Sequence, residues 1–127
     1  MVLWATTSVD AQELGDYRWQ YRILLLMDPY GSPKCTQQLR NMQQHTAAMQ
    51  KRDVLLFIYN GKMLMDEHMN RTPLNVKSVP NPTYEGVILI GKDGGVKIRK
   101  PFPVPPEYIF DRIDAMPMRQ SEIRDKK

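Results

Sequence analysis

The stretch Y-R-I-L-L-L-M-D-P-Y-G-S-P-K-C-T-Q-Q-L-R-N-M-Q-Q-H-T-A-A-M, residues 21–49, decides the fold. Ile23 to Met27 are five consecutive apolar residues, and the turn residues D-P-Y-G close the run. A short apolar run bounded by turn residues predicts a strand that is buried on both faces. Ser32 is a good N-cap residue, and Pro33 suits the first helical position because its missing N–H is not needed there. We therefore expect a buried strand that passes directly into a helix.

The helix expected after Pro33 has one apolar face. Its members recur at steps of four and three residues: Cys35, Leu39, Met42, Thr46 and Met49. The residues expected to face water are polar or charged: Gln37, Gln38, Arg40, Gln43, Gln44 and Lys51. This spacing predicts one continuous buried stripe along the helix.

Cys35 is the only cysteine of the chain and falls in the first turn of this helix. There the helix dipole and the neighbouring Lys34 favour the thiolate over the thiol, which would make the sulfur reactive. Free cysteine is also among the most often buried residues, so a purely structural role stays open. A single cysteine excludes an internal disulfide and a self-contained dithiol redox centre.

The remaining chain predicts three more strands and a last helix. Val54–Tyr59 is a second apolar run, so strand, helix and strand form a βαβ unit with a parallel pair. Residues 62–70 fit either a return strand or a short helix. Val87–Ile90 and Val96–Arg99 flank the turn K-D-G-G and predict an antiparallel pair.

The last helix is expected to open at Pro105 or Pro106 and to be interrupted by Pro117. Its inner face consists of apolar residues: Ile109, Phe110, Ile113 and Met116. The element order is therefore β-α-β followed by β-β-α. This order predicts an α/β, thioredoxin-like fold with a four-stranded mixed sheet flanked by helices.

Length and composition favour one globular domain over residues 14–124, preceded by a flexible arm or signal-peptide remnant at 1–13. The chain has 127 residues and a formal net charge of +4, and its basic clusters lack interleaved aromatic residues, so we expect no nucleic-acid partner. No apolar stretch approaches the ~20 residues that span a bilayer. The start, M-V-L-W-A-T-T-S-V-D-A, resembles the tail of a signal peptide. We therefore expect an extracytoplasmic protein, either periplasmic or secreted.

Three strings carry a family resemblance: Y-R-W-Q-Y-R at 17–22, L-I-G-K-D-G-G-V-K at 89–97 and I-D-A-M-P-M-R at 113–119. Together they resemble an uncharacterised domain-of-unknown-function family of the thioredoxin-like superfamily, over about residues 14–124. That family occurs in exported bacterial proteins and in vertebrate matrix proteins, including sushi-repeat proteins. The resemblance implies a thioredoxin-like fold and a location outside the cytoplasm. It implies no established activity.

The wider superfamily offers two comparisons for the cysteine. Thioredoxins carry Cys-x-x-Cys where this chain has S-P-K-C, so dithiol exchange is not available. Peroxiredoxins place Ser or Thr three residues before their reactive cysteine, as Ser32 and Cys35 do. However, Glu85 stands where peroxiredoxins carry an activating arginine, and a carboxylate there would raise the thiol pKa. Thioredoxins also carry a cis-proline directly before the strand that corresponds to Val87–Ile90 here. Pro82 is the candidate for this proline.

Two functions follow from these observations. The first is a non-enzymatic thioredoxin-like binding or adhesion module of an exported protein, with another protein or a matrix component as its partner. The second is a single-Cys thiol peroxidase or reductase, with Cys35 as nucleophile, Ser32 as hydrogen-bond donor and Lys34 as thiolate stabiliser. Neither requires a cofactor. Asp28 beside the junction could relay a proton to the thiol or cap the helix.

Other candidate sites are weaker. Met63, Met65, His68 and Met69 offer soft ligands for Cu(I), but methionines commonly fill gaps in a core, and we expect no metal. The string Met116–Arg119 is expected either to dock the C-terminal tail or to form an exposed binding edge. Tyr17 and Trp19 are expected to pack across the edge of the sheet.

Overall fold

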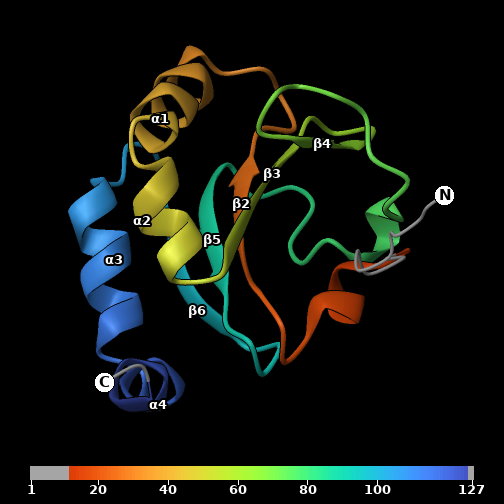
Figure 1. Ribbon diagram of the computed structural model, residues 1–127. Coiled ribbons are helices and arrows are strands. Elements are labelled where there is room, and N and C mark those ends of the chain that lie inside the picture. The colour runs from red at the N-terminus through yellow and green to blue at the C-terminus, as the bar shows by residue number, and fades with distance from the viewer. Residues whose placement is uncertain (1–11, 126–127) are drawn as a thin grey trace, which may run out of the picture.

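A five-stranded mixed sheet forms the middle of the computed structural model, which describes residues 12–125 (Figure 1). The strands are β2 (Arg22–Met27), β3 (Val54–Tyr59), β4 (Leu64–Asp66), β5 (Gly86–Ile90) and β6 (Val96–Lys100). Their order across the sheet is β4-β3-β2-β5-β6. Strands β2 and β3 are parallel, and every other neighbouring pair is antiparallel. The predicted βαβ unit and the antiparallel β5–β6 pair are confirmed.

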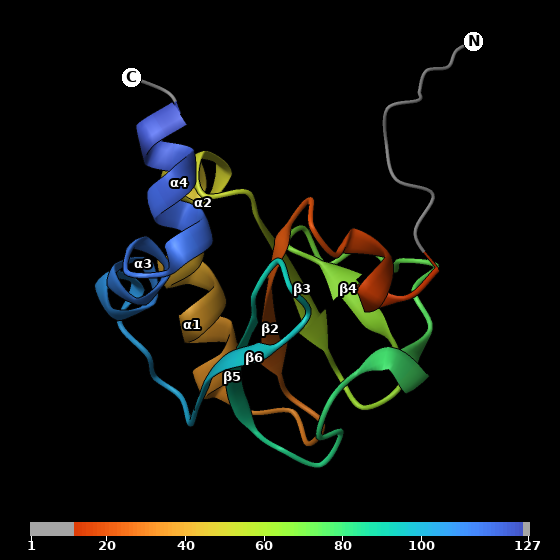
Figure 2. The same cartoon turned by 90° about the horizontal axis from the view of Figure 1, so that it is seen from below.

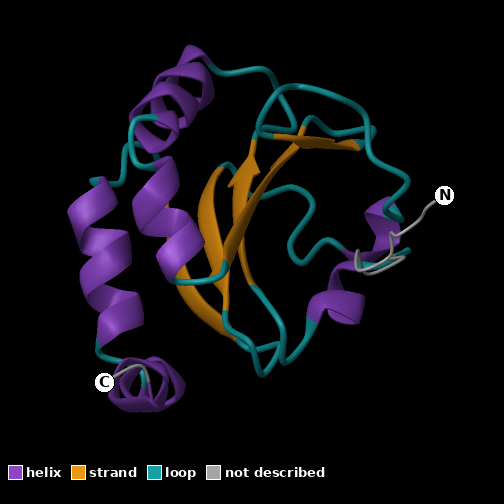
Figure 3. Ribbon diagram, viewed as in Figure 1, coloured by secondary structure: helices purple, strands orange, loops and turns teal. Residues whose placement is uncertain are grey.

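Four helices cover one face of the sheet (Figures 1 and 2). They are α1 (Pro33–Gln43), α2 (Thr46–Lys51), α3 (Pro106–Asp114) and α4 (Pro117–Asp125). The other face is covered by loops and by two 3-10 turns, η1 (Leu14–Tyr17) and η2 (Val76–Ser78). Figure 3 shows the strands in orange between these two layers. None of the helices described is both long and apolar enough to cross a membrane.

Strand β2 lies at the centre and separates two hydrophobic cores. Leu24 and Leu26 pack in the core on the helix side, whereas Ile23, Leu25 and Met27 pack in the core under the loops. All six residues of β2 are buried. The continuous apolar run in the sequence reflects this position, because a central strand covered on both sides buries every side chain.

The sheet has one strand more than the four expected. Strand β4 pairs antiparallel with the end of β3, so the return-strand interpretation of residues 62–70 is the correct one. It spans only three residues at the sheet edge. A segment this short has no room for the alternation of apolar and polar residues that identifies longer strands.

The single helix expected over residues 33–49 is two helices. The break lies at Gln44 and His45, where the Thr46 hydroxyl donates to the Gln43 carbonyl at 3.0 Å and competes with helical bonding. Gln38, expected to face water, is fully buried. Its side chain donates to the Val104 carbonyl at 2.8 Å and accepts from the Val104 N–H at 2.7 Å. Gln38 therefore joins α1 to the segment that leads into α3.

Of the other local predictions, some are confirmed and others are wrong. Tyr17 packs on Phe57, with ring centroids 5.8 Å apart, but Trp19 is 63% exposed and does not pack at the sheet edge. The backbone of Trp19 has a φ of 72°, and the Trp19 N–H donates to the Lys92 carbonyl. The cis peptide bond of the described segment precedes Pro103, so Pro82 is not the cis-proline suggested. The arm expected at 1–13 lies outside the described residues, except for its last two.

Candidate functional site

The predicted site at Cys35 forms where β2 ends and α1 begins. Ser32 is the N-cap of α1, and its hydroxyl accepts from the Lys34 N–H at 3.1 Å. Asp28 accepts from the Ser32 N–H at 2.6 Å, so its carboxylate holds the start of the helix. The sequence therefore placed the cap and Pro33 correctly, and Asp28 has the capping geometry.

The surroundings of Cys35 oppose ionisation of its thiol. Cys35 is 4% exposed, and burial is the first cause that raises its pKa to about 12. The negative charge of Asp28 and a hydrogen bond with it raise the pKa further, and Glu85 adds a smaller contribution. Lys34 is exposed and does not offset them. The depressed pKa that a reactive thiol needs is thus not found, and Glu85 acts in the direction expected from the sequence.

A cavity of about 260 Å³ lies beside Cys35. Of the soft ligands considered, Met65 and Met69 line it, whereas Met63 and His68 do not. His68 instead lies 3.5 Å from the Glu67 carboxylate. Within residues 12–125, no three His, Cys, Asp or Glu side chains cluster as a metal site would require. The cavity is lined by sulfur and apolar groups together with the polar side chains of Asp28, Thr36 and Asn60.

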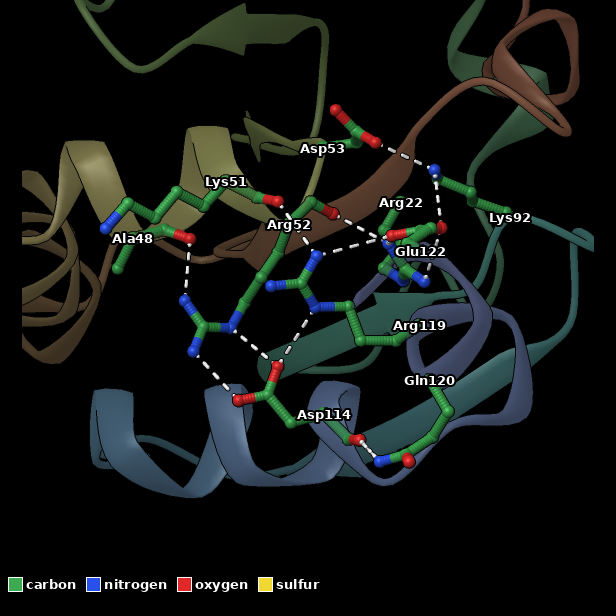
Figure 4. A network of polar contacts seen from close by, with 10 residues as sticks. All are labelled: Arg22, Ala48, Lys51, Arg52, Asp53, Lys92, Asp114, Arg119, Gln120 and Glu122. Atoms are coloured by element: carbon green, nitrogen blue, oxygen red, sulfur yellow. Dashed lines mark hydrogen bonds and ion pairs between the residues drawn. The ribbon is translucent and has the colours of Figure 1, made fainter. Parts of the chain in front are cut away.

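The second candidate site lies at the opposite end of β2 and was not predicted as a site. Arg22, the first residue of the strand, is 1% exposed. Its guanidinium donates to the Arg52 carbonyl at 2.7 Å and to both carboxylate oxygens of Glu122 at 3.2 Å (Figure 4). This forked pairing fixes α4 against the start of the central strand.

Lys92 and Asp53 extend the contacts of Glu122. The Lys92 ammonium lies 2.8 Å from Glu122 and 2.8 Å from Asp53. The turn between β5 and β6, the start of β3 and helix α4 therefore meet at the Lys92 ammonium (Figure 4). Hydrogen bonds from Lys92 and Arg22 lower the pKa of Glu122 and outweigh burial, the largest single influence, which acts to raise it.

Asp114 is the second hub of this network. Arg52 binds it through two hydrogen bonds of 3.0 and 2.8 Å, and Arg119 adds one of 3.2 Å. Arg119 also donates to the Lys51 carbonyl at 3.0 Å (Figure 4). The hydrogen bond from Arg52 is the main cause that holds the pKa of Asp114 below its ordinary value, and Arg119 contributes less.

We call this group the Glu122 network. Its cationic members are Arg22, Arg52, Lys92 and Arg119, and its carboxylates are Asp53, Asp114 and Glu122. Four positive groups thus face three negative ones, which leaves an excess of one positive charge. Because the network joins β2, β3, the β5–β6 turn, α3 and α4, it is also the main polar support of the C-terminal helix.

The sequence held a signal for part of this network. The three strings that carry the family resemblance, at 17–22, 89–97 and 113–119, contribute Arg22, Lys92, Asp114 and Arg119. Glu122 and Asp53 gave no signal of their own. Met116 is buried and docks the corner between α3 and α4, while Met118 is 38% exposed. Docking is therefore confirmed for Met116, and the exposed binding edge stays a prediction.

Comparison with known proteins gives one positive result. A family model described as a domain of unknown function (DUF4174) matches residues 13–122. Neither a curated protein nor a solved structure matches the chain. The match spans both ends of β2, including Cys35 and the Glu122 network. The chain therefore belongs to the DUF4174 family.

Proposed function

We propose that the protein is a non-enzymatic binding module of an exported protein. The observation that carries this proposal is the state of Cys35, whose thiol is 4% exposed and has a pKa raised to about 12. With a pKa raised this far, very little of the thiol is ionised at pH 7. Peroxidases and thiol reductases react through the thiolate, so this environment removes the species on which both depend.

We also propose that the fold is thioredoxin-like. The support is the order β-α-β then β-β-α around a central β2, with a parallel β2–β3 pair and antiparallel β5 and β6. Strand β4 is an addition at the far edge. A location outside the cytoplasm and a protein or matrix partner rest on the family resemblance and on the N-terminal residues, which lie outside the described part.

The alternative is a single-Cys thiol peroxidase or reductase. One observation favours it, namely the cavity of about 260 Å³ that borders Cys35 and could admit a small oxidant. In this reading Ser32 would donate to the substrate; its hydroxyl accepts from the Lys34 N–H and still carries one proton to donate. The absence of a described cation beside the thiol weighs against this function.

The two functions differ in how fast hydrogen peroxide oxidises the folded protein. We expect Cys35 to remain a thiol at pH 7 under conditions that oxidise N-acetylcysteine, as measured by intact-protein mass spectrometry. Addition of urea should expose the thiol and restore the rate of the free amino acid. Rapid formation of sulfenic acid in the folded protein would contradict the binding proposal and support the peroxidase.

A further inference from the structure

A cavity of about 380 Å³ lies between the β5–β6 turn and the corner that joins α3 to α4. Its volume is at the lower end of the range for small-molecule sites, roughly 300–1,000 Å³. One side consists of basic side chains: Arg22, Lys92, Lys97 and Arg112. The other consists of small and apolar residues, Ala115 to Met118. The cavity therefore offers a charged wall and an apolar wall to one ligand.

The charged wall is positive. Among the residues that line the cavity, Asp93 is the one carboxylate, and it is occupied by Lys97 at 2.9 Å. Arg22 and Lys92 are paired within the Glu122 network, which itself has one positive charge in excess. Arg112 is exposed and forms no ion pair with a described residue. The local excess of positive charge is thus small, and it suits a ligand with a single negative charge.

Arg22 has a buried N–H group that lacks a hydrogen-bond acceptor among the described residues. It lines the cavity and is 1% exposed, yet its Nε finds no acceptor among the described residues. Buried guanidinium N–H groups are normally satisfied, and leaving one without a partner costs free energy. It is the sole buried side-chain nitrogen or oxygen of the described segment with this defect. Because this atom is covered, an acceptor in the cavity would reach it only after a small shift of the cavity wall.

Helix α4 adds a second attraction for an anion. The helix has nine residues, and its first turn contributes Pro117 and Met118 to the cavity wall. The N–H groups of a first helical turn have no partner within the helix, and the dipole makes this end positive. Negative oxygen atoms are the groups such an end binds.

We propose that this cavity binds a small monoanionic carboxylate attached to a short apolar group. The carboxylate would lie toward Arg22, Arg112 and the start of α4, and the apolar group against Met116 and Met118. A carboxylate fits better than a phosphate dianion because the unpaired positive charge is small and Asp93 lies in the same wall. The inference rests on the proposed binding role, for which it names a place and a ligand class.

The test is a titration of the full chain with hexanoate, followed by ¹H–¹⁵N NMR. We expect saturable shifts for the amides of Gly91, Lys92 and Met118, with a dissociation constant in the millimolar range, as for other ligands of few atoms. Hexanamide has the same shape without the charge and should leave these signals in place. Equal shifts with both compounds, or no saturable shift with hexanoate, would overturn the proposal.

Variants decide whether the basic wall is responsible. Arg22 is part of the folded network, so its replacement could unfold the protein; the informative change is Arg112→Gln at the exposed rim. We expect it to weaken hexanoate binding roughly threefold, as for one partly screened charge. Arg99→Gln on β6 is the matched control, since Arg99 is equally exposed but does not line the cavity. Equal weakening by both variants would contradict the proposed site.

Two sources of the carboxylate can be separated. A free metabolite and the C-terminus of a peptide present the same group, so N-acetyl-glycyl-leucine is compared with its C-terminal amide. Tighter binding of the free-acid peptide than of hexanoate indicates a chain terminus, weaker binding indicates a free acid, and both support a carboxylate site. Preference for the amide would overturn it. Peroxide oxidation of Cys35 is measured separately, so failure of the binding role and failure of this cavity give different results.

Discussion

The two ends of strand β2 have opposite chemistry. At its start, Arg22 enters a network of four cationic and three acidic side chains that joins five segments of the chain. Just beyond its end, Cys35 lies in an apolar layer, with Asp28 and Glu85 as the charges that influence its thiol. The thiol that was expected to be reactive is therefore kept protonated. Most of the buried charge lies at the other end of β2, where no site was predicted.

This difference shows how the two ends of one central strand are stabilised in different ways. The thiol end is stabilised by packing, and its carboxylates make the uncharged thiol the preferred form. The charged end is stable because each buried ion finds several partners, and we propose that its small excess of positive charge attracts a ligand. A junction that resembles a redox site in sequence can thus serve as core.

The largest effect is expected from Arg22→Leu. Removing this residue leaves the Arg52 carbonyl without its donor and Glu122 without its forked pairing, although Lys92 still contacts Glu122, and breaking such a buried pair typically costs about 3–5 kcal/mol. Urea unfolding should show this loss. Arg99→Leu, at an exposed position of β6, is the control and should change stability far less. A loss below that of an ordinary surface substitution would mean that the network does not stabilise α4.

The next largest effect is expected at the thiol end, from Gln38→Ala. The substitution leaves the N–H and carbonyl of Val104 without partners and opens a space in a buried site, which should cost about 2–3 kcal/mol. Gln37→Ala on the exposed side of the same helix is the control, with an expected change within about 0.5 kcal/mol. Similar midpoints of denaturation for both variants would contradict the role of Gln38.

A fall in pH should weaken the Glu122 network before it affects the packing around Cys35. The pKa values of Asp114 and Glu122 are lower in the folded protein than in the unfolded chain, so their contribution to stability is full above the unfolded values and is lost as the pH falls through the folded ones. We expect the free energy of unfolding to drop below about pH 4.5. Glu122→Gln should make this drop shallower, and an unchanged profile would contradict the lowered pKa values.

The smallest effect is expected from Cys35→Ser. The hydroxyl is slightly smaller than the thiol and lies within reach of Asp28, so a loss of about 1 kcal/mol is expected, as for an ordinary point substitution. Affinity for hexanoate should not change, because Cys35 does not line the basic cavity. A large change in hexanoate binding would mean that the two ends of β2 are coupled.

The sequence predicted the parts of the fold that depend on local pattern. Apolar runs identified the strands at 23–27 and 54–59, and Ser32 with Pro33 identified the start of α1. It failed for Gln38, because a glutamine that bonds the backbone of Val104 looks like any surface glutamine in a helix. It also failed for the Glu122 network, since Arg22 and Glu122 are 100 positions apart and no spacing rule joins them.

The most direct test of this contrast is the pH dependence of Cys35 alkylation by iodoacetamide in the folded protein. Free cysteine ionises near pH ~8.5, whereas burial, Asp28 and Glu85 should hold the Cys35 thiol protonated to about pH 12. We expect the rate to keep rising above pH 9 without reaching a plateau, with circular dichroism confirming that the protein is still folded. A plateau with a midpoint below that of free cysteine would show an activated thiol and contradict the binding role.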